Sequence, residues 1–361
     1  MQAAVLEKVG EPLEIQEIRV DRPGPREVLV RTAATGVCHS DLHFIQGLYP
    51  HPLPTILGHE AAGVVDAVGS SVTYVRPGDH VIACLSAFCG ECSYCLGGRP
   101  ALCGQRELLE RDPADAPRLS RDGTPLPQFL RLSAFAEQML IHEHALVKVR
   151  PDMPLDRAAL IGCAVMTGVG AVLLTARVPA GATVAVIGCG GVGLNSVQGA
   201  ALAGAGRIIA IDALPSKLDL ACEFGATDVV DASAVDPVHA VRELTGGGVE
   251  YSFEAIGKKV TSEQAFRMLA RGGTATLVGM IPVGTKIELH GPDFLDEKKV
   301  QGSNMGSNRF RVDMPRYVDL YLEGRLKLDE LVSRTGTLHD VNDAFRAMEA
   351  GEVARTVLLY D

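Results

Sequence analysis

The chain has 361 residues, of which 47% are hydrophobic and 22% are charged, and its formal net charge is -10. This length favours two domains, and this composition excludes a disordered or collagen-like protein. The negative charge argues against nucleic acid and against an anionic membrane surface as partners, and it favours a small-molecule substrate.

The N-terminal segment carries Glu7, Lys8, Glu11 and Glu14 where a secretory signal peptide needs an apolar core. We therefore expect a cytoplasmic protein whose nine cysteines are thiols. Three cysteines stand outside any closely spaced group of potential metal ligands, and we expect each to be a small buried apolar residue. These are Cys84, Cys189 and Cys222.

Residues 1 to about 155 form short β-rich runs such as EVLVRTAATGV, AAGVVDAVG and DHVIAC, separated by Gly, Pro and Asp turns. The charged, Pro-containing stretch 104–132 is predicted to be a long surface loop. The uncharged stretch 158–176 is long enough to span a bilayer, but its Gly, Thr and Cys content favours a buried core segment.

From about residue 178 the pattern alternates between short apolar strands and helices of ten residues or more, beginning with TVAVIGCGGVGLNSVQGAALAGAG. This alternation predicts a doubly wound parallel sheet. The last sixty residues return to a mixed pattern, with helices expected around VDMPRYVDLYLEGRL and LHDVNDAFRAMEAGE and a closing strand in RTVLLYD.

The run GCGGVG contains a G-x-G-x-x-G pattern formed by Gly188, Gly190 and Gly193. It follows a predicted strand, opens a predicted helix and precedes Asp212 at the end of the next strand, which is the context of a dinucleotide-binding turn. Asp212 can bind both hydroxyls of an adenosine ribose, and no arginine follows it to neutralise a 2'-phosphate, so NAD is favoured over NADP. Gly191 and Val192, which lie in the same turn, are also predicted to contact the cofactor.

The segment CGECSYCLGGRPALC places four thiols close together at Cys89, Cys92, Cys95 and Cys103. Four thiolates close a tetrahedral shell around Zn²⁺ and leave no position for a substrate, so this cluster predicts a structural zinc. An iron–sulfur cluster also takes four cysteines, but the spacing to the fourth differs from that of the bacterial ferredoxin run.

A second set of potential ligands is dispersed: Cys38 in GVCHSD, His59 in GHE and Cys163 in IGCAV. Two sulfurs and one imidazole leave a fourth position open, which is typical of a catalytic zinc. Spacing alone supports this set weakly, because isolated histidines and cysteines are often structural.

The run GHEAAGVVDAVGSSV (58–72) fits the zinc-containing alcohol dehydrogenase signature, and it lies between GVCHSDLH and the four-cysteine segment in that family's order. The whole chain, to the closing ARTVLLYD, resembles the zinc-dependent medium-chain alcohol dehydrogenases. The resemblance implies an α/β protein with a GroES-like β-rich catalytic domain and a Rossmann domain built on a doubly wound parallel sheet. We expect the catalytic domain over 1–163 and 305–361, with a zinc lobe at about 84–104, and the NAD-binding domain over 164–304.

The resemblance also implies roles for residues beside these motifs. Ser40 is expected to take the proton of the alcohol, and His43 to pass it through the cofactor ribose to solvent. Asp41 is expected to orient His59, and Glu60 to lie close to the metal.

The same resemblance implies further cofactor contacts and two zinc ions per subunit. His39 and Arg355 match contacts to the pyrophosphate, Lys217 matches a contact to the adenosine ribose, and Thr167 matches a threonine beside the nicotinamide.

Five positions that line the substrate in this family are apolar in this chain: Tyr49, Leu85, Phe129, Leu130 and Met280. Leu85 stands where a bulky aromatic residue often narrows the pocket, and Ser40 is smaller than a threonine. The resemblance therefore implies reversible oxidation of primary or secondary alcohols that are medium-length, aromatic, allylic or cyclic.

Other activities stay open within the family. A glutathione- or mycothiol-linked formaldehyde dehydrogenase would need cationic residues at the pocket, for which Arg106, Arg118 and Arg121 are candidates. A nicotinoprotein that retains NAD tightly is a further alternative. A non-catalytic relative is disfavoured, because every zinc ligand is present. The long 104–132 segment resembles that of dimeric members, so we expect a homodimer joined through the Rossmann sheets, with a tetramer as the alternative.

Overall fold

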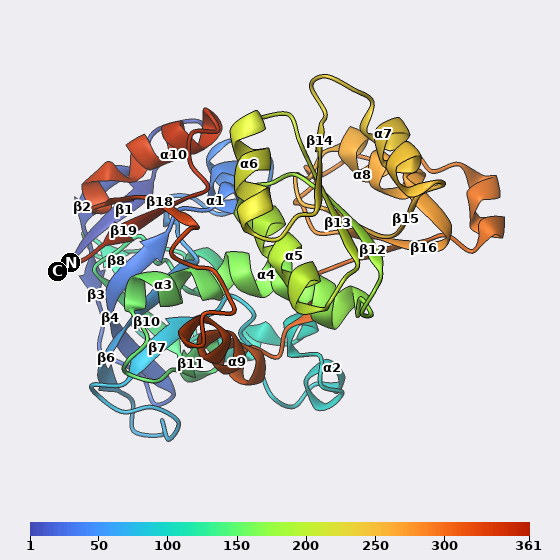
Figure 1. Ribbon diagram of the computed structural model, residues 1–361. Coiled ribbons are helices and arrows are strands. Elements are labelled where there is room, and N and C mark those ends of the chain that lie inside the picture. Colours follow the sequence, from blue (N-terminus) through green and yellow to red (C-terminus); the bar gives the residue numbers. More distant parts are fainter. The chain divides into compact units, whose positions relative to one another are not determined.

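The computed structural model describes the whole chain, Met1 to Asp361, and its backbone divides into two compact units (Figure 1). The first unit comprises Met1–Cys163 and Arg309–Asp361, and the second comprises Ala164–Asn308. The chain thus leaves the first unit once and returns to it. The sequence-based boundary after residue 304 falls inside the second unit, shortly before its end.

The first unit is built on a mainly antiparallel sheet of seven strands with the order β11-β7-β6-β4-β19-β18, in which β10 also pairs with β4. Its strands are β4 (Glu27–Gly36), β6 (Glu60–Val68), β7 (His80–Ala83), β10 (Gln138–His142), β11 (Leu146–Lys148), β18 (Val332–Gly336) and β19 (Arg355–Leu359). Two small sheets join β2 (Glu14–Glu17), β1 (Gln2–Leu6) and β5 (Thr55–Ile56), and β3 (Arg19–Val20), β8 (Leu119–Arg121) and β9 (Thr124–Pro125). Its helices are α1 (His39–Ile45), α2 (Ser93–Leu96), α3 (Leu155–Leu160), α9 (Phe310–Leu322) and α10 (Val341–Glu349).

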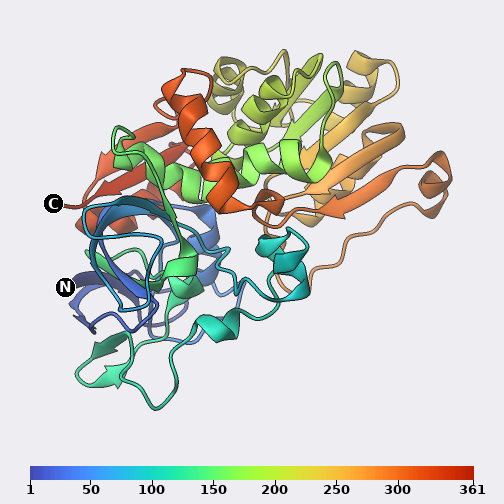
Figure 2. The ribbon, with the colours of Figure 1, turned by 90° about the horizontal axis from the view of Figure 1, so that it is seen from below.

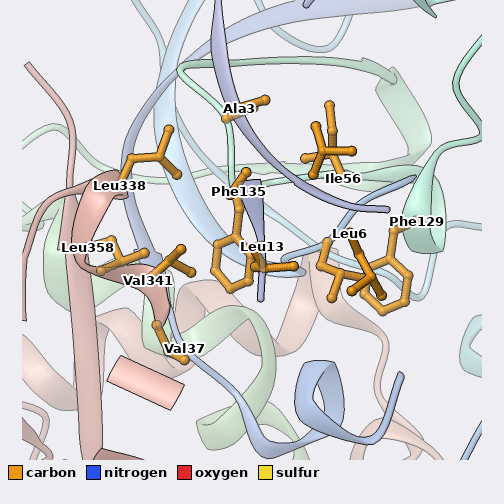
Figure 3. Packing of buried hydrophobic residues seen from close by; sticks show 14 of the residues in the cluster. Ala3, Leu6, Leu13, Val37, Ile56, Phe129, Phe135, Leu338, Val341 and Leu358 are labelled. Carbon is orange, nitrogen blue, oxygen red and sulfur yellow. The ribbon is translucent and has the colours of Figure 1, made fainter. Parts of the chain in front are cut away.

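The two ends of the chain share one hydrophobic core, which explains why the C-terminal segment belongs to the first unit. In Figure 3, Leu338, Val341 and Leu358 lie in the same cluster as the N-terminal Ala3 and Leu13. β19 is the antiparallel neighbour of β4 in the main sheet. The predicted C-terminal helices and closing strand are therefore confirmed as α9, α10 and β19.

The segment 104–132 is largely exposed and mostly irregular, as its charge and prolines predict, but it also packs against the first unit. It forms the short hairpin β8–β9 and three-residue to four-residue 3₁₀ turns, and it buries Leu109, Leu119 and Leu126. The physical reason is that its charges are neutralised by partners inside the first unit, so the segment can pack its apolar residues.

Glu27, at the start of β4, is the centre of this neutralisation. Its carboxylate accepts hydrogen bonds from Arg118 Nε at 2.6 Å, from Arg111 Nη2 at 2.6 Å and from the backbone N–H of Gly24 at 2.8 Å. Burial alone would raise the pKa of Glu27, but the bonds from Arg111 and Arg118 outweigh it and lower the pKa to about 2. Glu27 therefore anchors the 104–132 segment to the sheet.

Replacing this carboxylate with an amide, Glu27→Gln, is expected to destabilise the first unit by about 3 kcal/mol at neutral pH. The variant removes the buried anion that bridges Arg111 and Arg118, although Arg111 keeps its pair with Asp21 and Arg118 keeps its pair with Glu110. A pKa lowered from 4.5 to about 2 corresponds to the same magnitude. Because the folded-state pKa is the lower one, this stabilisation is complete above about pH 5 and disappears as the pH falls towards 2. Urea unfolding across this pH range measures the difference.

The matched control is Glu17→Gln, whose carboxylate is 83% exposed and is expected to leave stability nearly unchanged. Equal stability of the wild type and Glu27→Gln at pH 7 would contradict the anchoring role.

The second unit contains a six-stranded parallel sheet with the order β14-β13-β12-β15-β16-β17. This is the 3-2-1-4-5-6 order of a doubly wound Rossmann sheet, as the sequence predicts. The strands are β12 (Thr183–Ile187), β13 (Arg207–Asp212), β14 (Asp228–Asp231), β15 (Val249–Glu254), β16 (Leu269–Leu277) and β17 (Lys299–Gly302). The helices are α4 (Met166–Gly170), α5 (Gly191–Leu202), α6 (Pro215–Glu223), α7 (Pro237–Thr245) and α8 (Lys259–Arg267).

The two ends of α7 show how individual residues determine where a helix begins and ends. Asp236 caps the helix by accepting a hydrogen bond from the backbone N–H of His239 at 2.8 Å, and Pro237 occupies the first helical position. Gly246 ends the helix in the left-handed conformation, which glycine adopts without strain.

One helix, Leu155–Ala176, has the length and composition to cross a membrane, and 83% of its most apolar window is buried inside the protein. It includes α3, α4 and the π-helical turns Ile161–Val165 and Ala171–Ala176. The prediction that this stretch is a core segment is confirmed.

Candidate functional site: a buried Cys–His–Cys centre

Three elements of the first unit bring Cys38, His59 and Cys163 together. Cys38 immediately precedes α1, His59 immediately precedes β6, and Cys163 lies in the π-helical turn Ile161–Val165. Their ligand atoms all lie within 4.8 Å of one another, and all three residues are buried. His59 Nε2 lies 3.3 Å from Cys163 Sγ, close to the separation of about 3.6 Å that a shared tetrahedral zinc requires. The donor set and its spacing therefore fit zinc.

Asp41 fixes the orientation of the imidazole. Its Oδ1 lies 3.0 Å from His59 Nδ1 and also accepts the backbone N–H of Gly58 at 3.1 Å, within a site where Asp41 is fully buried. Because Nδ1 is bonded to Asp41, Nε2 is left to face the two sulfurs, which is the usual arrangement around a metal-bound histidine.

A buried ion pair lies beside the centre. Arg355 Nη2 is 3.7 Å from Glu60 Oε2 and also 3.7 Å from Cys38 Sγ, while Nη1 donates to the backbone carbonyl of Val37 at 3.2 Å. Burial raises the pKa of Glu60 to about 7, against the opposing effect of Arg355. The predicted contact of Arg355 with the cofactor stays a prediction.

The site also depends on Gly36, which belongs to none of the sequence motifs. A Cβ at this position would lie 2.7 Å from Cδ of Glu60. A glycine two residues before a candidate ligand, at the end of a strand, was the available signal.

The thiols and the imidazole strongly affect one another's protonation. A hydrogen bond between the two thiols lowers the pKa of Cys38 and raises the pKa of Cys163. Burial alone would lower the pKa of His59, but the charges of Asp41 and Cys38 raise it well above its usual value. The centre thus gathers negative charge in the interior, where a divalent cation would neutralise it.

Removing the charge that orients the imidazole, with Asp41→Asn, is expected to lower zinc affinity and kcat/KM by about 10- to 100-fold while the fold is retained. The amide can still contact His59, but it no longer stabilises positive charge on the ring. Zinc content at defined chelator concentrations and steady-state kinetics measure the effect. The matched control is Asp66→Asn on β6, which is exposed and lies 3.9 Å from Arg31. An unchanged zinc affinity in Asp41→Asn would contradict the orienting role.

The predicted proton path lies on α1. His43 is buried, its Nδ1 has no hydrogen-bond partner, and burial lowers the pKa of its imidazole. Its ring stacks at 6.2 Å on Tyr49 and lies 5.1 Å from the ring of His39, which is exposed. Ser40 is half-buried on the first turn of α1. A neutral, unpartnered ring nitrogen can accept a proton, so the geometry is compatible with a relay.

Of the predicted substrate-lining residues, Phe129 has its ring 6.2 Å from that of the candidate ligand His59. Leu130 packs against the cluster of the chain ends, and Leu85 packs against the core of the main sheet. Met280 belongs to the second unit and follows β16. The assignment of these five residues to a substrate pocket stays a prediction.

The four-cysteine lobe is assembled around α2. Sulfur–sulfur distances are 3.4 Å for Cys92–Cys95, 3.8 Å for Cys89–Cys95 and 3.9 Å for Cys92–Cys103. A zinc ion bound by four thiolates at 2.3 Å separates its sulfurs by about 3.8 Å, so the lobe fits the ion. Backbone N–H groups of Cys92 and Cys89 point at Cys89 Sγ and Cys103 Sγ, both at 3.3 Å.

The remaining cysteines differ from one another. Cys84 and Cys189 are fully buried, as predicted, but the prediction for Cys222 is wrong because that residue is exposed near the end of α6. The prediction failed because the identity of one residue does not show whether it lies on the buried or on the exposed face of a helix.

The nucleotide turn lies between β12 and α5 in the second unit. Gly188 adopts a φ of +92°, which is unfavourable for other residues, and a Cβ on Gly193 would lie 1.6 Å from the carbonyl oxygen of Gly188. A Cβ on Gly190 would meet nothing within 4 Å, so the backbone is open there to an approaching pyrophosphate. Gly191, Val192 and Gly193 form the first turn of α5, whose N–H groups suit an anion.

Asp212 ends β13, and its two carboxylate oxygens accept the backbone N–H groups of Cys189 at 2.8 Å and Leu214 at 3.1 Å. Lys217 is half-buried on α6, and Thr167 on α4 is buried with its hydroxyl 3.4 Å from Met305 Sδ. The predicted contacts of these residues with NAD stay predictions.

The three loop arginines that were candidates for binding a charged substrate have partners within the first unit. Arg106 donates to the carbonyls of Ala87 at 2.9 Å and Ala101 at 2.6 Å. Arg118 is buried against Glu27, and Arg121 is paired with Glu7.

Comparisons with known proteins agree with this geometry. Residues 24–151 match the alcohol dehydrogenase GroES-like domain family, and residues 191–323 match the zinc-binding dehydrogenase family. The S-(hydroxymethyl)glutathione dehydrogenases of Paracoccus denitrificans and Photobacterium damsela subsp. piscicida are 38% and 41% identical, each over 99% of both chains.

Two solved structures are also similar. An alcohol dehydrogenase zinc-binding domain protein from Burkholderia ambifaria has a TM-score of 0.94 at 38% identity, covering 100% of this chain and 98% of that one. The benzyl alcohol dehydrogenase of Acinetobacter calcoaceticus has a TM-score of 0.92 at 33% identity, covering 100% of this chain and 99% of that one. The predicted GroES-like and Rossmann folds are confirmed, as are the zinc and nicotinamide nucleotide cofactors. This chain therefore belongs to the zinc-dependent medium-chain alcohol dehydrogenase family.

Proposed function

We propose that this enzyme reversibly oxidises apolar primary or secondary alcohols, of the aromatic, allylic, cyclic or medium-length kind, with NAD as the hydride acceptor. The single observation that carries the choice of substrate is the engagement of Arg106, Arg118 and Arg121 by other groups of the first unit. None of these cations is left to bind the carboxylates of a thiol adduct such as S-(hydroxymethyl)glutathione.

The residues of the first unit would divide the work as follows. Cys38, His59 and Cys163 would hold the catalytic zinc, and the bound ion would act as a Lewis acid that makes the substrate hydroxyl easier to ionise. Asp41 keeps Nε2 of His59 available, while Ser40 would accept the hydroxyl proton and His43 would pass it on.

Transfer of the hydride belongs to the cofactor, which the turn at Gly188 and the carboxylate of Asp212 would orient. No arginine follows Asp212 directly, and its negative charge opposes a 2'-phosphate, so NAD is preferred over NADP.

The test compares kcat/KM for benzyl alcohol and for S-(hydroxymethyl)glutathione with each cofactor, alongside zinc content per chain. We expect NAD and benzyl alcohol to be preferred by at least about 100-fold, because a buried unpaired carboxylate costs several kcal/mol. Preference for the glutathione adduct would overturn the proposal and favour the second candidate, which the names of the relatives support.

A tightly bound cofactor has its own signature in the same assay. If purified protein carries stoichiometric NAD and reduces an external acceptor without releasing NADH, the nicotinoprotein alternative holds instead. Free release of NADH into solution supports the proposal.

We also propose that the chain forms a cytoplasmic homodimer through the β17 edge of the second unit. β17 ends the sheet, and the segment before it extends away from the body of this unit in Figures 1 and 2. This segment exposes three large apolar side chains: Val283 at 66%, Phe294 at 47% and Leu295 at 88%. An unpaired strand edge beside exposed apolar residues is a natural place for a second copy.

Introducing a charge into this segment, with Leu295→Glu, is expected to shift the protein from dimer to monomer in analytical ultracentrifugation, because the carboxylate would be desolvated in the interface. Val9→Glu, at a 55% exposed position of the first unit, serves as the control. A dimer of unchanged affinity in Leu295→Glu would show that the contact lies elsewhere.

A further inference from the structure

A buried carboxyl group of the second unit has no part in the proposed reaction. Glu254 is the last residue of β15, and its side chain is fully buried. Burial raises the pKa of Glu254, and the groups that oppose this rise are hydrogen-bond donors, namely the hydroxyl of Thr261 and nearby backbone N–H groups, rather than cations. The carboxyl group is therefore neither a surface charge nor half of an ion pair.

Glu254 lies where a doubly wound sheet binds its ligand. The strand order reverses between β12 and β15, and ligands of such a sheet bind outside the carboxyl ends of the strands at this reversal. Glu254 is the register partner of Ile187, the last residue of β12, and the nucleotide turn begins at the next residue, Gly188. The carboxyl group is thus placed beside the nucleotide turn.

The side chain of Glu254 holds the segment that follows β15. Its Oε1 accepts the backbone N–H groups of Ile256 at 3.0 Å and Gly257 at 2.8 Å, and the hydroxyl of Thr261 at 2.7 Å. This segment touches the nucleotide turn, because a Cβ on Gly188 would lie 2.4 Å from Cγ1 of Ile256. The bonds to Oε1 therefore fix where Ile256 lies against the turn.

The backbone of the same residue holds the segment that follows β16. The carbonyl oxygen of Glu254 accepts the N–H groups of Val278 and Gly279, both at 2.9 Å. The two segments pack backbone against backbone, since a Cβ on Gly279 would lie 2.1 Å from the nitrogen of Gly257. One residue thus holds both segments, 255–257 and 278–280, at the carboxyl ends of neighbouring strands.

A simpler explanation is that Glu254 only completes the hydrogen bonds of a tight turn. That role needs one acceptor atom, whereas Oε2 is a second buried oxygen without a hydrogen-bond partner. Burying such a group is costly, and buried ionisable groups with shifted pKa values are concentrated at functional sites. The place of Glu254 at the reversal of strand order indicates which function is involved.

We propose that Glu254 is a positioning residue for the nicotinamide dinucleotide, and that it holds the segments 255–257 and 278–280 in the arrangement that the bound cofactor requires. Segments that are ordered before binding lose less conformational freedom when the cofactor binds, so the affinity is higher. The proposal requires only that the second unit binds such a cofactor, and it does not depend on which alcohol is oxidised.

Fluorescence titration of the zinc-loaded enzyme with NADH tests the proposal without any alcohol present. We expect Glu254→Ala to raise the dissociation constant of NADH by about tenfold or more, because the segment 255–257 loses its side-chain hydrogen bonds. Glu254→Gln is expected to restore nearly wild-type affinity, since its amide oxygen can accept the same bonds. NADPH replaces NADH if the wild type binds it more tightly, so an incorrect cofactor preference would not be mistaken for a failure of this proposal.

The matched control is Ser252→Ala on the same strand. Ser252 is fully buried, and its hydroxyl donates to the carbonyl of Ala265 in α8 at 2.7 Å rather than to either segment. This variant also removes one buried hydrogen bond, so we expect lower thermal stability and an unchanged affinity for NADH. A loss of affinity in Ser252→Ala as large as in Glu254→Ala would reduce Glu254 to a structural role and overturn the proposal.

Hydrogen exchange of the wild type gives a second test, which holds even if Glu254→Ala does not fold. We expect the amides of 255–257 and 278–280 to exchange more slowly when NADH is bound. Unchanged exchange in both segments would overturn the proposal. Wild-type affinity for NADH in Glu254→Ala, or an affinity of Glu254→Gln as low as that of Glu254→Ala, would do the same.

Discussion

Replacing the imidazole of the buried centre, with His59→Asn, is expected to reduce zinc content from two ions per chain to one and to lower kcat/KM by about 1,000-fold or more. Two ligand sets are present, and this change removes the only nitrogen ligand of the three-residue set. A Lewis-acid metal contributes several kcal/mol to the stabilisation of developing charge, and each 1.36 kcal/mol corresponds to a factor of ten in rate. Zinc analysis and steady-state kinetics on the same preparations measure both effects.

The matched control is His51→Asn. His51 is a half-buried histidine of the same unit, and its Nε2 lies 3.4 Å from the hydroxyl of Thr55 rather than near a thiol. It is expected to retain both zinc ions and activity within a few-fold of the wild type. If His59→Asn retained two zinc ions and its activity, the metal centre would lie elsewhere.

The two ligand sets were predictable from the sequence for different reasons. Cys89 and its three partners lie within one short segment, so local spacing alone identified a closed zinc shell. Cys38, His59 and Cys163 are dispersed, and they could be grouped only through the family resemblance. Their convergence depends on β4, β6 and the 155–176 helix meeting in one core, which spacing does not reveal.

The ion-pair partners of the charged residues could not be predicted from the sequence. Arg118 and Arg121 look like free surface cations in a charged segment, but Glu27 and Glu7 bind them from nearly a hundred or more residues earlier in the chain. Arg355 likewise contacts Glu60 and Cys38 through the pairing of β19 with β4. Long-range ion pairs of this kind leave no periodic pattern, whereas the alternating strands and helices of the second unit do.

Removing one thiolate of the other ligand set, with Cys92→Ser, is expected to release the second zinc and to unfold the lobe while the rest of the first unit stays folded. Structural zinc contributes about 10–16 kcal/mol to the folding of small metal-binding peptides, so it is the largest single stabilising interaction available to this segment. The lobe has little else: α2 contains no buried residue, and Tyr94, Leu96 and Leu102 are exposed. Limited proteolysis should therefore cut between residues 88 and 104 at least tenfold faster.

Cys222→Ser distinguishes this effect from the general loss of a thiol, because Cys222 is exposed on α6 and lies far in sequence from both ligand sets. It is expected to keep two zinc ions and wild-type resistance to the protease. The catalytic set should remain loaded in Cys92→Ser, since Cys38, His59 and Cys163 are held by the main sheet and its core rather than by the lobe. Loss of both zinc ions from Cys92→Ser would instead mean that the two centres fold as one unit.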